Sequence, residues 1–403
     1  MTLGPVSYLD CVAFCLFLVP QLIWQAGLWE TVVCVLRALP FLVFKLPVTF
    51  LYERWLIKPE RRAPFVQRSS AFEDIVVRCV RYAFANIPPR VGRVFFSRSV
   101  ALPFLRFRLL RQGYLTLPAH YREITATKLK GVWLVKAPEK RLDFVLYYVH
   151  GGGFSLGSPY FYLEFLLTWL SLLGDVGYDN PGIFALDYTL VPDASFPTQL
   201  HETVRGYQHV LAVALDPAII CVGGDSAGAA LVLSMLLYLA RHNSSCGDGA
   251  GQVRRIPKPA LAVLISPWVT LVSERHRNST SDYLDVDALR KYGLQFAGSK
   301  RLGNNPLASP GNCKDVAWWR NAAPTKGILI TYGQEEVIAP EIKDLVGILQ
   351  KMGLDLDAEE EPAGIHAWPI ASLFLSSSTE QRYKGVRRLV DKVREKIIAH
   401  SSK

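Results

Sequence analysis

Residues 218–230 read Ala-Ile-Ile-Cys-Val-Gly-Gly-Asp-Ser-Ala-Gly-Ala-Ala and place a serine between two glycines. The short, β-branched run 218–222 predicts a buried strand. The residues that follow have apolar side chains at helical spacing and predict a helix that ends near residue 243. Ser226 therefore lies on a predicted strand-to-helix turn. There the pentapeptide 224–228 fits the pattern G-x-S-x-G, whose glycines allow a strained turn that exposes the serine hydroxyl.

A second motif follows an earlier predicted strand. Residues 142–149 form an apolar run, and residues 150–154 read His-Gly-Gly-Gly-Phe. Consecutive glycines let backbone N–H groups approach a ligand with no side chain between them, which is what an oxyanion hole requires. A tight structural loop would explain the glycines alone. Together with the serine motif further along the chain, they favour a catalytic interpretation.

A serine hydroxyl is a weak nucleophile and needs a base, together with an acid that orients the base. The strand predicted at 327–332 is followed by Glu335 and Glu336, where the acid of a triad belongs in chain order. Either carboxylate can serve, and the other would be a solvated turn residue. His366 comes later, on a glycine-containing loop after an extended segment, and is the best candidate for the base.

The two motifs, together with Asp-Tyr-Thr-Leu-Val-Pro at 187–192 and Phe-Pro at 196–197, resemble the hormone-sensitive-lipase-like branch of the α/β-hydrolases, especially its fungal membrane-associated members. The resemblance covers residues 130–395. It implies the α/β-hydrolase fold, a mostly parallel central sheet with helices on both faces and a cap region over the site. The alternation of predicted strands and helices independently favours a parallel sheet.

The resemblance also implies roles for individual residues. Ser226 would be the nucleophile and His366 the base. Many members of this branch carry aspartate at the acid position, whereas this chain is most similar to a glutamate variant of the pattern. Glu336 is therefore the expected acid, with Glu335 as the alternative.

The expected oxyanion hole is built from backbone groups. By family likeness its donors would be the amides of Gly152, Gly153 and Ala227, and losing one donor would cost on the order of a hundredfold in rate. His150 and Gly151 would support the oxyanion loop, so that His150 is not expected to act as the base.

These parts predict a serine hydrolase that cleaves a carboxylic ester through an acyl-enzyme. The substrate is expected to be a hydrophobic ester such as a sterol ester, an acylglycerol or an acylated secondary metabolite. No metal or organic cofactor is expected. One alternative is acyl transfer or ring closure, if the cap excludes water. Another is a non-catalytic small-molecule receptor on the same fold, although binding alone would require neither Ser226 nor His366.

The 403-residue chain is long enough for one large domain and an N-terminal extension. We expect a hydrophobic anchor region at 1–60, a basic helical linker or cap contribution at 61–125, the catalytic domain at 126–395 and a polar tail at 396–403.

The N-terminal extension contains two apolar stretches. Residues 11–29 carry no charge and are long enough for a membrane helix, which predicts a single retained anchor. The first ten residues lack Lys and Arg, so this stretch is a poor signal peptide. The second stretch, 38–51, is interrupted by Pro40, Lys45 and Pro47, and we expect it to lie in the interface plane. The alternative is that both stretches are buried helices that cover the core.

The net charge of +10 comes largely from arginines between residues 54 and 111. Nucleic acid is one possible partner for a chain with this excess of positive charge. Next to an apolar anchor, however, an anionic membrane surface is the simpler partner, and we expect no nucleic acid. The expected location is the membrane of the endoplasmic reticulum. The sequence does not decide which side of this membrane the catalytic domain faces. The seven cysteines show no metal-ligand spacing.

Overall fold

A sheet of eight strands forms the centre of the part of the chain that the computed structural model describes, residues 3–244, 255–299 and 304–398. Its order is β1-β2-β4-β3-β5-β6-β7-β8. The strands are β1 (His120–Ala126), β2 (Leu129–Val135), β3 (Phe144–Val149), β4 (Pro181–Leu186), β5 (Ile220–Asp225), β6 (Leu261–Ile265), β7 (Ile328–Gly333) and β8 (Leu356–Glu361). β2 pairs antiparallel with β1 and β4, and the other neighbours pair parallel.

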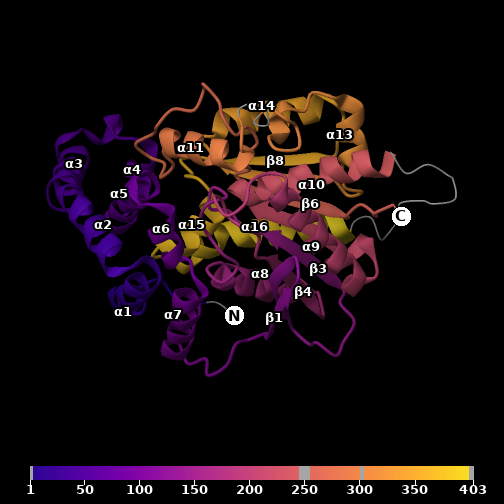
Figure 1. The fold of residues 1–403 in the computed structure, drawn as a ribbon, viewed down its shortest axis with the longest axis horizontal. Helices are drawn as coiled ribbons and strands as arrows, with labels where there is room; N and C mark the ends of the chain where they lie inside the picture. The colour runs from indigo at the N-terminus through magenta and orange to yellow at the C-terminus, as the bar shows by residue number, and fades with distance from the viewer. Residues whose placement is uncertain (1–2, 245–254, 300–303, 399–403) are drawn as a thin grey trace.

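Helices cover both faces of this sheet (Figure 1). They are α8 (Leu163–Asp175), α9 (Thr198–Ala214), α10 (Ser226–Ser244), α11 (Val286–Ala297), α13 (Val316–Ala322), α14 (Ala339–Lys351), α15 (Trp368–Leu375) and α16 (Thr379–Ile398). Val145 and Tyr147 of β3 pack in an apolar cluster with residues of α9, α10 and α14. Phe144 and Leu146 pack in a second cluster with residues of α8 and α16. Successive side chains of a strand point to opposite faces, so β3 is buried on both sides. This architecture confirms the expected fold class.

The N-terminal helices form a group at one end of the sheet, drawn in indigo in Figure 1. They are α1 (Tyr8–Gln21), α2 (Leu28–Pro40), α3 (Leu46–Leu51), α4 (Pro64–Arg68), α5 (Ala71–Asn86), α6 (Pro89–Phe95) and α7 (Arg98–Arg111). At the other end of the chain, the expected polar tail 396–403 begins within α16, and its residues beyond 398 lie outside the described part.

Two helices of this group are long and apolar enough to cross a membrane, Tyr8–Ala26 and Leu28–Leu56. The expected single segment 11–29 is not one helix, because Gly27 has a φ of +95° and turns the chain between the two. The second stretch is also more regular than expected. Helix α2 continues past Pro40 through a π-helical turn into α3, which contains Pro47, so neither proline ends the helix.

A buried ion network joins α1 to helices that pack on the sheet. Asp10 and Arg108 are fully buried, and an oxygen of Asp10 lies 3.0 Å from a guanidinium nitrogen of Arg108. Arg108 also pairs with Glu164 on α8 at 3.0 Å, and Glu164 pairs with Arg382 on α16 at 3.1 Å. Because these charges are removed from water, each depends on its partners. The network therefore fixes α1 against α7, α8 and α16.

We expect Asp10→Ala to lower the free energy of unfolding by about 3 kcal/mol, since it leaves Arg108 and Arg111 without a shared carboxylate in a buried site. Glu30→Ala is the control. Glu30 pairs with Arg90 at 3.5 Å on the surface, and such pairs contribute about 0–1 kcal/mol. Thermal unfolding in detergent measures both variants. Equal stability of the two variants would contradict a structural role for the network.

Candidate active site

Ser226 occupies the sharp turn between β5 and α10. Its φ of +51° lies in the left-handed region, which is strained for a residue with a side chain. The flanking glycines are required by close packing. A Cβ at Gly228 would lie 2.0 Å from the carbonyl oxygen of Val149, and a Cβ at Gly224 would lie 2.5 Å from the same oxygen. The strand-to-helix turn predicted from the pentapeptide is thus present in the fold.

The glycine loop after β3 presents backbone amides beside this turn. Gly152 and Gly153 have φ values of +107° and +63°. A Cβ at Gly152 would lie 2.2 Å from the carbonyl oxygen of Leu156, so a larger residue does not fit. Among the described residues, the N–H groups of Gly152 and Gly153 have no protein acceptor. Ala227 lies in the first turn of α10, where N–H groups have no partner within the helix.

Asp225 connects the two loops. Its buried carboxylate accepts hydrogen bonds from the N–H of Gly151 at 2.9 Å, the hydroxyl of Tyr148 at 2.7 Å and the hydroxyl of Tyr162 at 2.8 Å. Burial raises the pKa of Asp225, although these hydrogen bonds oppose the rise. The sequence identified Asp225 only as part of the serine motif. The structure shows that it also holds the start of the glycine loop beside Ser226.

His150 lies beneath the glycine loop. Its ring stacks on Tyr188 with 4.4 Å between centroids, and its Nδ1 lies 2.7 Å from the carbonyl oxygen of Gly151. Burial lowers the pKa of His150 to about 4, so its imidazole is neutral at physiological pH. A neutral ring can donate from Nδ1 to that carbonyl, which matches a supporting position in the loop.

His366 and Glu336 form a buried pair. Nδ1 of His366 lies 3.0 Å from Oε2 of Glu336. Oε1 of Glu336 accepts a hydrogen bond from the hydroxyl of Ser266 at 2.5 Å, and it also accepts from the N–H of Gly333. Glu335 is only half-buried, and its carboxylate accepts a hydrogen bond from Ser281 at 3.2 Å. Of the two adjacent glutamates, Glu336 is thus the one that contacts the histidine.

The pair also sets the charge state of the imidazole. Burial lowers the pKa of His366, but the hydrogen bond and the charge of Glu336 outweigh burial, and the pKa lies above its usual value. Burial raises the pKa of Glu336, and the hydrogen bond from His366 opposes that rise. An imidazolium formed at His366 is therefore stabilised by an adjacent carboxylate.

A second buried carboxylate, which the sequence did not reveal, orders the same loop. Oδ1 of Asp282 accepts the N–H of His366 at 3.0 Å, and Oδ2 accepts the N–H of Val337 at 2.9 Å. The charge of Asp282 also contributes to the raised pKa of His366. Asp282 lies in a polar loop with no periodic pattern, and nothing local in the sequence distinguishes it from its neighbours.

Several of the catalytic candidates line one cavity of about 360 Å³. Ser226, His366, Gly152 and Gly153 all line it. Most of the remaining lining is apolar and comes from α1, α5, α6 and α15, and includes Phe14, Val76, Val77, Val80, Phe84, Phe95, Ile370 and Phe374. Within the described ranges, no cluster of His, Cys, Asp or Glu is arranged to hold a metal ion. The cavity is thus polar at the serine and apolar elsewhere.

Comparisons with known proteins find acetyl hydrolases and esterases. A family model described as steryl acetyl hydrolase matches residues 110–384. An acetyl-hydrolase from Streptomyces hygroscopicus is 30% identical over 236 residues, which cover 57% of this chain and 70% of that protein. An acetyl esterase from Salmonella schwarzengrund is 30% identical over 203 residues, which cover 48% of this chain but only 58% of that protein.

Solved structures show the same fold. A crystal structure of an esterase from the bacterial hormone-sensitive lipase family has a TM-score of 0.61 at 24% identity, and covers 82% of this chain and 99% of that chain. A mutant of the esterase E40 has a TM-score of 0.63 at 23% identity, and covers 82% of this chain and 100% of that chain.

We expect Glu336→Gln to lower kcat for ester hydrolysis by roughly 10³- to 10⁴-fold, because an amide neither holds the imidazole tautomer nor stabilises the imidazolium. Glu335→Gln is the matched control and should stay within a few-fold of wild type. Steady-state hydrolysis of p-nitrophenyl acetate measures both. A larger loss in Glu335→Gln would move the acid role to that residue.

We expect Asp282→Asn to shift the acid limb of the kcat/KM profile to lower pH. Removing a negative charge destabilises the imidazolium and lowers the pKa of His366, so the neutral base persists to lower pH. The control is Asp285→Asn, which changes a carboxylate that caps α11. A loss of activity with an unmoved acid limb would show that Asp282 acts only on structure.

Proposed function

The chain belongs to the steryl acetyl hydrolase family, and from this membership we propose that it removes an acetyl or other short acyl group from an apolar alcohol. It is a carboxylic ester hydrolase. The observation that supports the proposal is that Ser226, His366, Gly152 and Gly153 line one cavity whose remaining lining is mostly apolar. We assign Ser226, His366 and Glu336 as its triad.

The proposed mechanism uses these groups in two half-reactions. His366 takes the proton of Ser226 as the hydroxyl oxygen attacks the ester carbonyl, and Glu336 stabilises the imidazolium. The amides of Gly152, Gly153 and Ala227 stabilise the oxyanion. His366 then protonates the leaving alcohol. In the second half-reaction it takes a proton from the water that attacks the acyl-enzyme, and it returns this proton to the oxygen of Ser226 as the acid is released.

The substrate class follows from the cavity and the relatives. Burying an apolar alcohol against the phenylalanine and valine side chains of the lining is favourable by about 25 cal/mol per Å² of apolar surface. A charged or strongly hydroxylated alcohol would lose its hydration there. The names of the relatives, acetyl-hydrolase and acetyl esterase, favour a short acyl group. A steryl acetate has both properties. No observation favours acyl transfer over hydrolysis.

We further propose that the enzyme associates with the membrane of the endoplasmic reticulum. The two apolar N-terminal helices support association with a membrane. Exposed arginines that follow them, such as Arg61, Arg90 and Arg106, would meet anionic head groups, and we propose no nucleic-acid partner. In this arrangement residues 126–395 carry the chemistry, 61–125 contribute to the cap, and 1–60 contact the lipid. Cavity-lining residues of α5 and α6 support the cap assignment.

The test is labelling with a fluorophosphonate, which reacts only with an activated serine. We expect detergent-solubilised wild type and Ser234→Ala to be labelled and to release acetate from apolar acetates, and Ser226→Ala to do neither. Ser234 is a suitable control because it is buried in the same helix and its hydroxyl bonds only within that helix. Absence of labelling in folded wild type would contradict the hydrolase mechanism and favour the small-molecule receptor.

A further inference from the structure

The apolar end of the active-site cavity is built by the N-terminal helices. Phe14 of α1, Phe84 of α5 and Phe95 of α6 line the cavity that also contains Ser226. These three aromatic residues precede the part of the chain that the family model matches, 110–384. The family core thus supplies the chemistry, and the N-terminal helices supply much of the wall that faces the substrate.

The outer surface of the same helices is also apolar. Most of the exposed large apolar side chains among the described residues lie between Tyr8 and Leu56. Trp24 is 86% exposed, Phe44 is 70% exposed and Trp55 is 74% exposed. No residue of the helix Leu28–Leu56 is buried. An apolar surface of this extent indicates contact with a membrane or another apolar partner.

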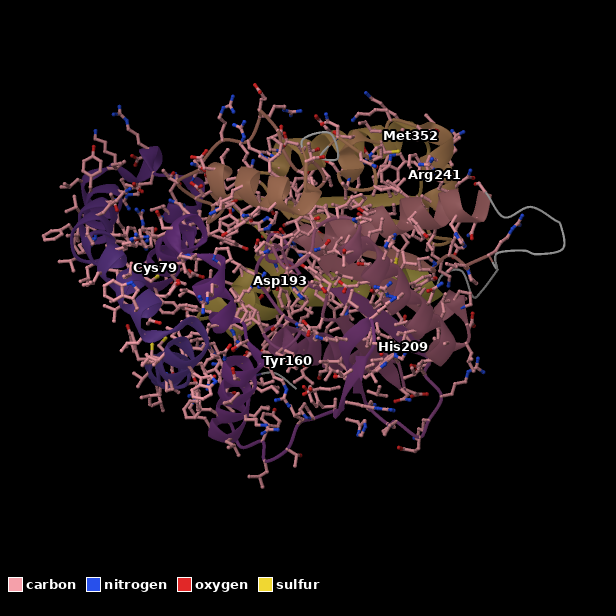
Figure 2. All side chains as sticks on the ribbon, viewed as in Figure 1. Cys79, Tyr160, Asp193, His209, Arg241 and Met352 are labelled. Carbon is pink, nitrogen blue, oxygen red and sulfur yellow. The ribbon has the colours of Figure 1, made fainter. Side chains whose placement is uncertain are left out.

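The helix Leu28–Leu56 lies along the enzyme, because one side of it is held by α5. The ring of Phe41 stacks on Tyr82 with 4.2 Å between centroids, and the hydroxyl of Tyr82 donates to the carbonyl of Arg37. Further along, Glu53 pairs with Arg78 at 2.7 Å. Figure 2 labels Cys79, which lies on α5 within this group of helices. Contacts along the helix therefore fix its orientation relative to the catalytic core.

These contacts exclude lipid from one side of the helix and favour an orientation in the plane of the interface. If the helix crossed the bilayer, the charged side chains of α5 would enter the hydrocarbon, which is costly. The helix is also long. Its 29 residues extend about 43 Å, more than the ~30 Å hydrocarbon core of a bilayer. Exposed cations along and after it, Lys45, Lys58 and Arg61, complement anionic head groups.

Val80 marks where the cavity reaches this surface. It lies on α5, lines the cavity and is 40% exposed. Phe14, the cavity residue of α1, lies on the helix whose outer side carries exposed residues such as Leu9 and Leu16. Both α1 and α5 therefore contribute residues to the cavity lining and exposed apolar side chains to the surface.

We propose that the enzyme rests on one leaflet, with Leu28–Leu56 in the plane of the interface, and that the ester passes from the bilayer into the cavity between α1 and α5. This inference rests on the proposed function, because it requires an apolar ester as substrate. Direct entry avoids exposing the apolar alcohol to water, which is unfavourable. The occupant of this opening is thus a membrane-dissolved ester.

The test compares two esters. Cholesteryl acetate is embedded in vesicles of phosphatidylcholine and phosphatidylserine, and p-nitrophenyl acetate is supplied in solution. A charge at the opening, Val80→Asp, should lower the ratio of vesicle to soluble activity at least tenfold. Ile75→Asp places the same charge on α5 at 37% exposure but outside the cavity lining, and should leave the ratio within twofold of wild type.

The outcomes separate the two proposals. An unchanged ratio in Val80→Asp would overturn entry from the bilayer, even if both esters are still hydrolysed. Failure of wild type to hydrolyse either ester would instead contradict the proposed function.

A second experiment determines the orientation of the helix Leu28–Leu56 on the membrane. Cysteines replace Glu30 and Lys58 in a variant that lacks the exposed native cysteines, and this variant is bound to sealed vesicles. An impermeant maleimide should modify both from one side. Protection of one of them until detergent is added would overturn the in-plane orientation.

Discussion

The proposed catalytic arrangement depends on the close approach of the central strands β3 and β5 at their carboxyl ends. The two strands pair in parallel, with Val149 opposite Gly224, so the loops that follow them leave the sheet side by side. The approach leaves no space for side chains at Gly224 or Gly228, whose Cβ atoms would collide with the carbonyl oxygen of Val149. Asp225 then bonds the glycine loop to the serine turn. Ser226, the proposed nucleophile, and the glycine amides proposed as oxyanion donors are thereby placed by backbone packing rather than by flexible side chains.

His366, the proposed base, is held in place by a different means, a set of buried carboxylates. Glu336 follows β7 and bonds the ring of His366, while Asp282 bonds the backbone of the same residue. Ser266, at the end of β6, donates to Glu336 and accepts from the N–H of Ala367. Three segments distant in sequence therefore fix both the ring and the backbone of one histidine. The low dielectric that raises the pKa of Glu336 also strengthens its interaction with the imidazolium.

The sequence was sufficient for the parts of this site that are local. The pentapeptide 224–228 and the glycine run after β3 were identified because each combines a buried strand with glycines that the backbone requires. Glu335 and Glu336 could not be separated by local reasoning, because adjacent residues in a turn differ mainly in side-chain direction. That direction depends on Ser266 and Gly333. Asp282 was missed for a related reason, since its partners are the distant Val337 and His366.

Local sequence patterns also did not predict two strands, or the continuity of one helix. β4 begins at Pro181-Gly182, a pair that normally marks a turn, and β1 is an edge strand with many polar residues, so neither has the signal of a buried strand. The prolines in the second apolar stretch suggested an interruption that the helix does not have. The N-terminal helices are tied to two loops beside the candidate site, because Arg81 of α5 donates to the carbonyl of Asp282 at 2.6 Å and Arg93 of α6 donates to that of Ser155 at 3.1 Å. The helices that form the apolar wall thus share hydrogen bonds with the glycine loop and with the loop of Asp282, whose carboxylate bonds the backbone of His366. The cavity wall and the proposed catalytic groups therefore belong to one continuous packing arrangement.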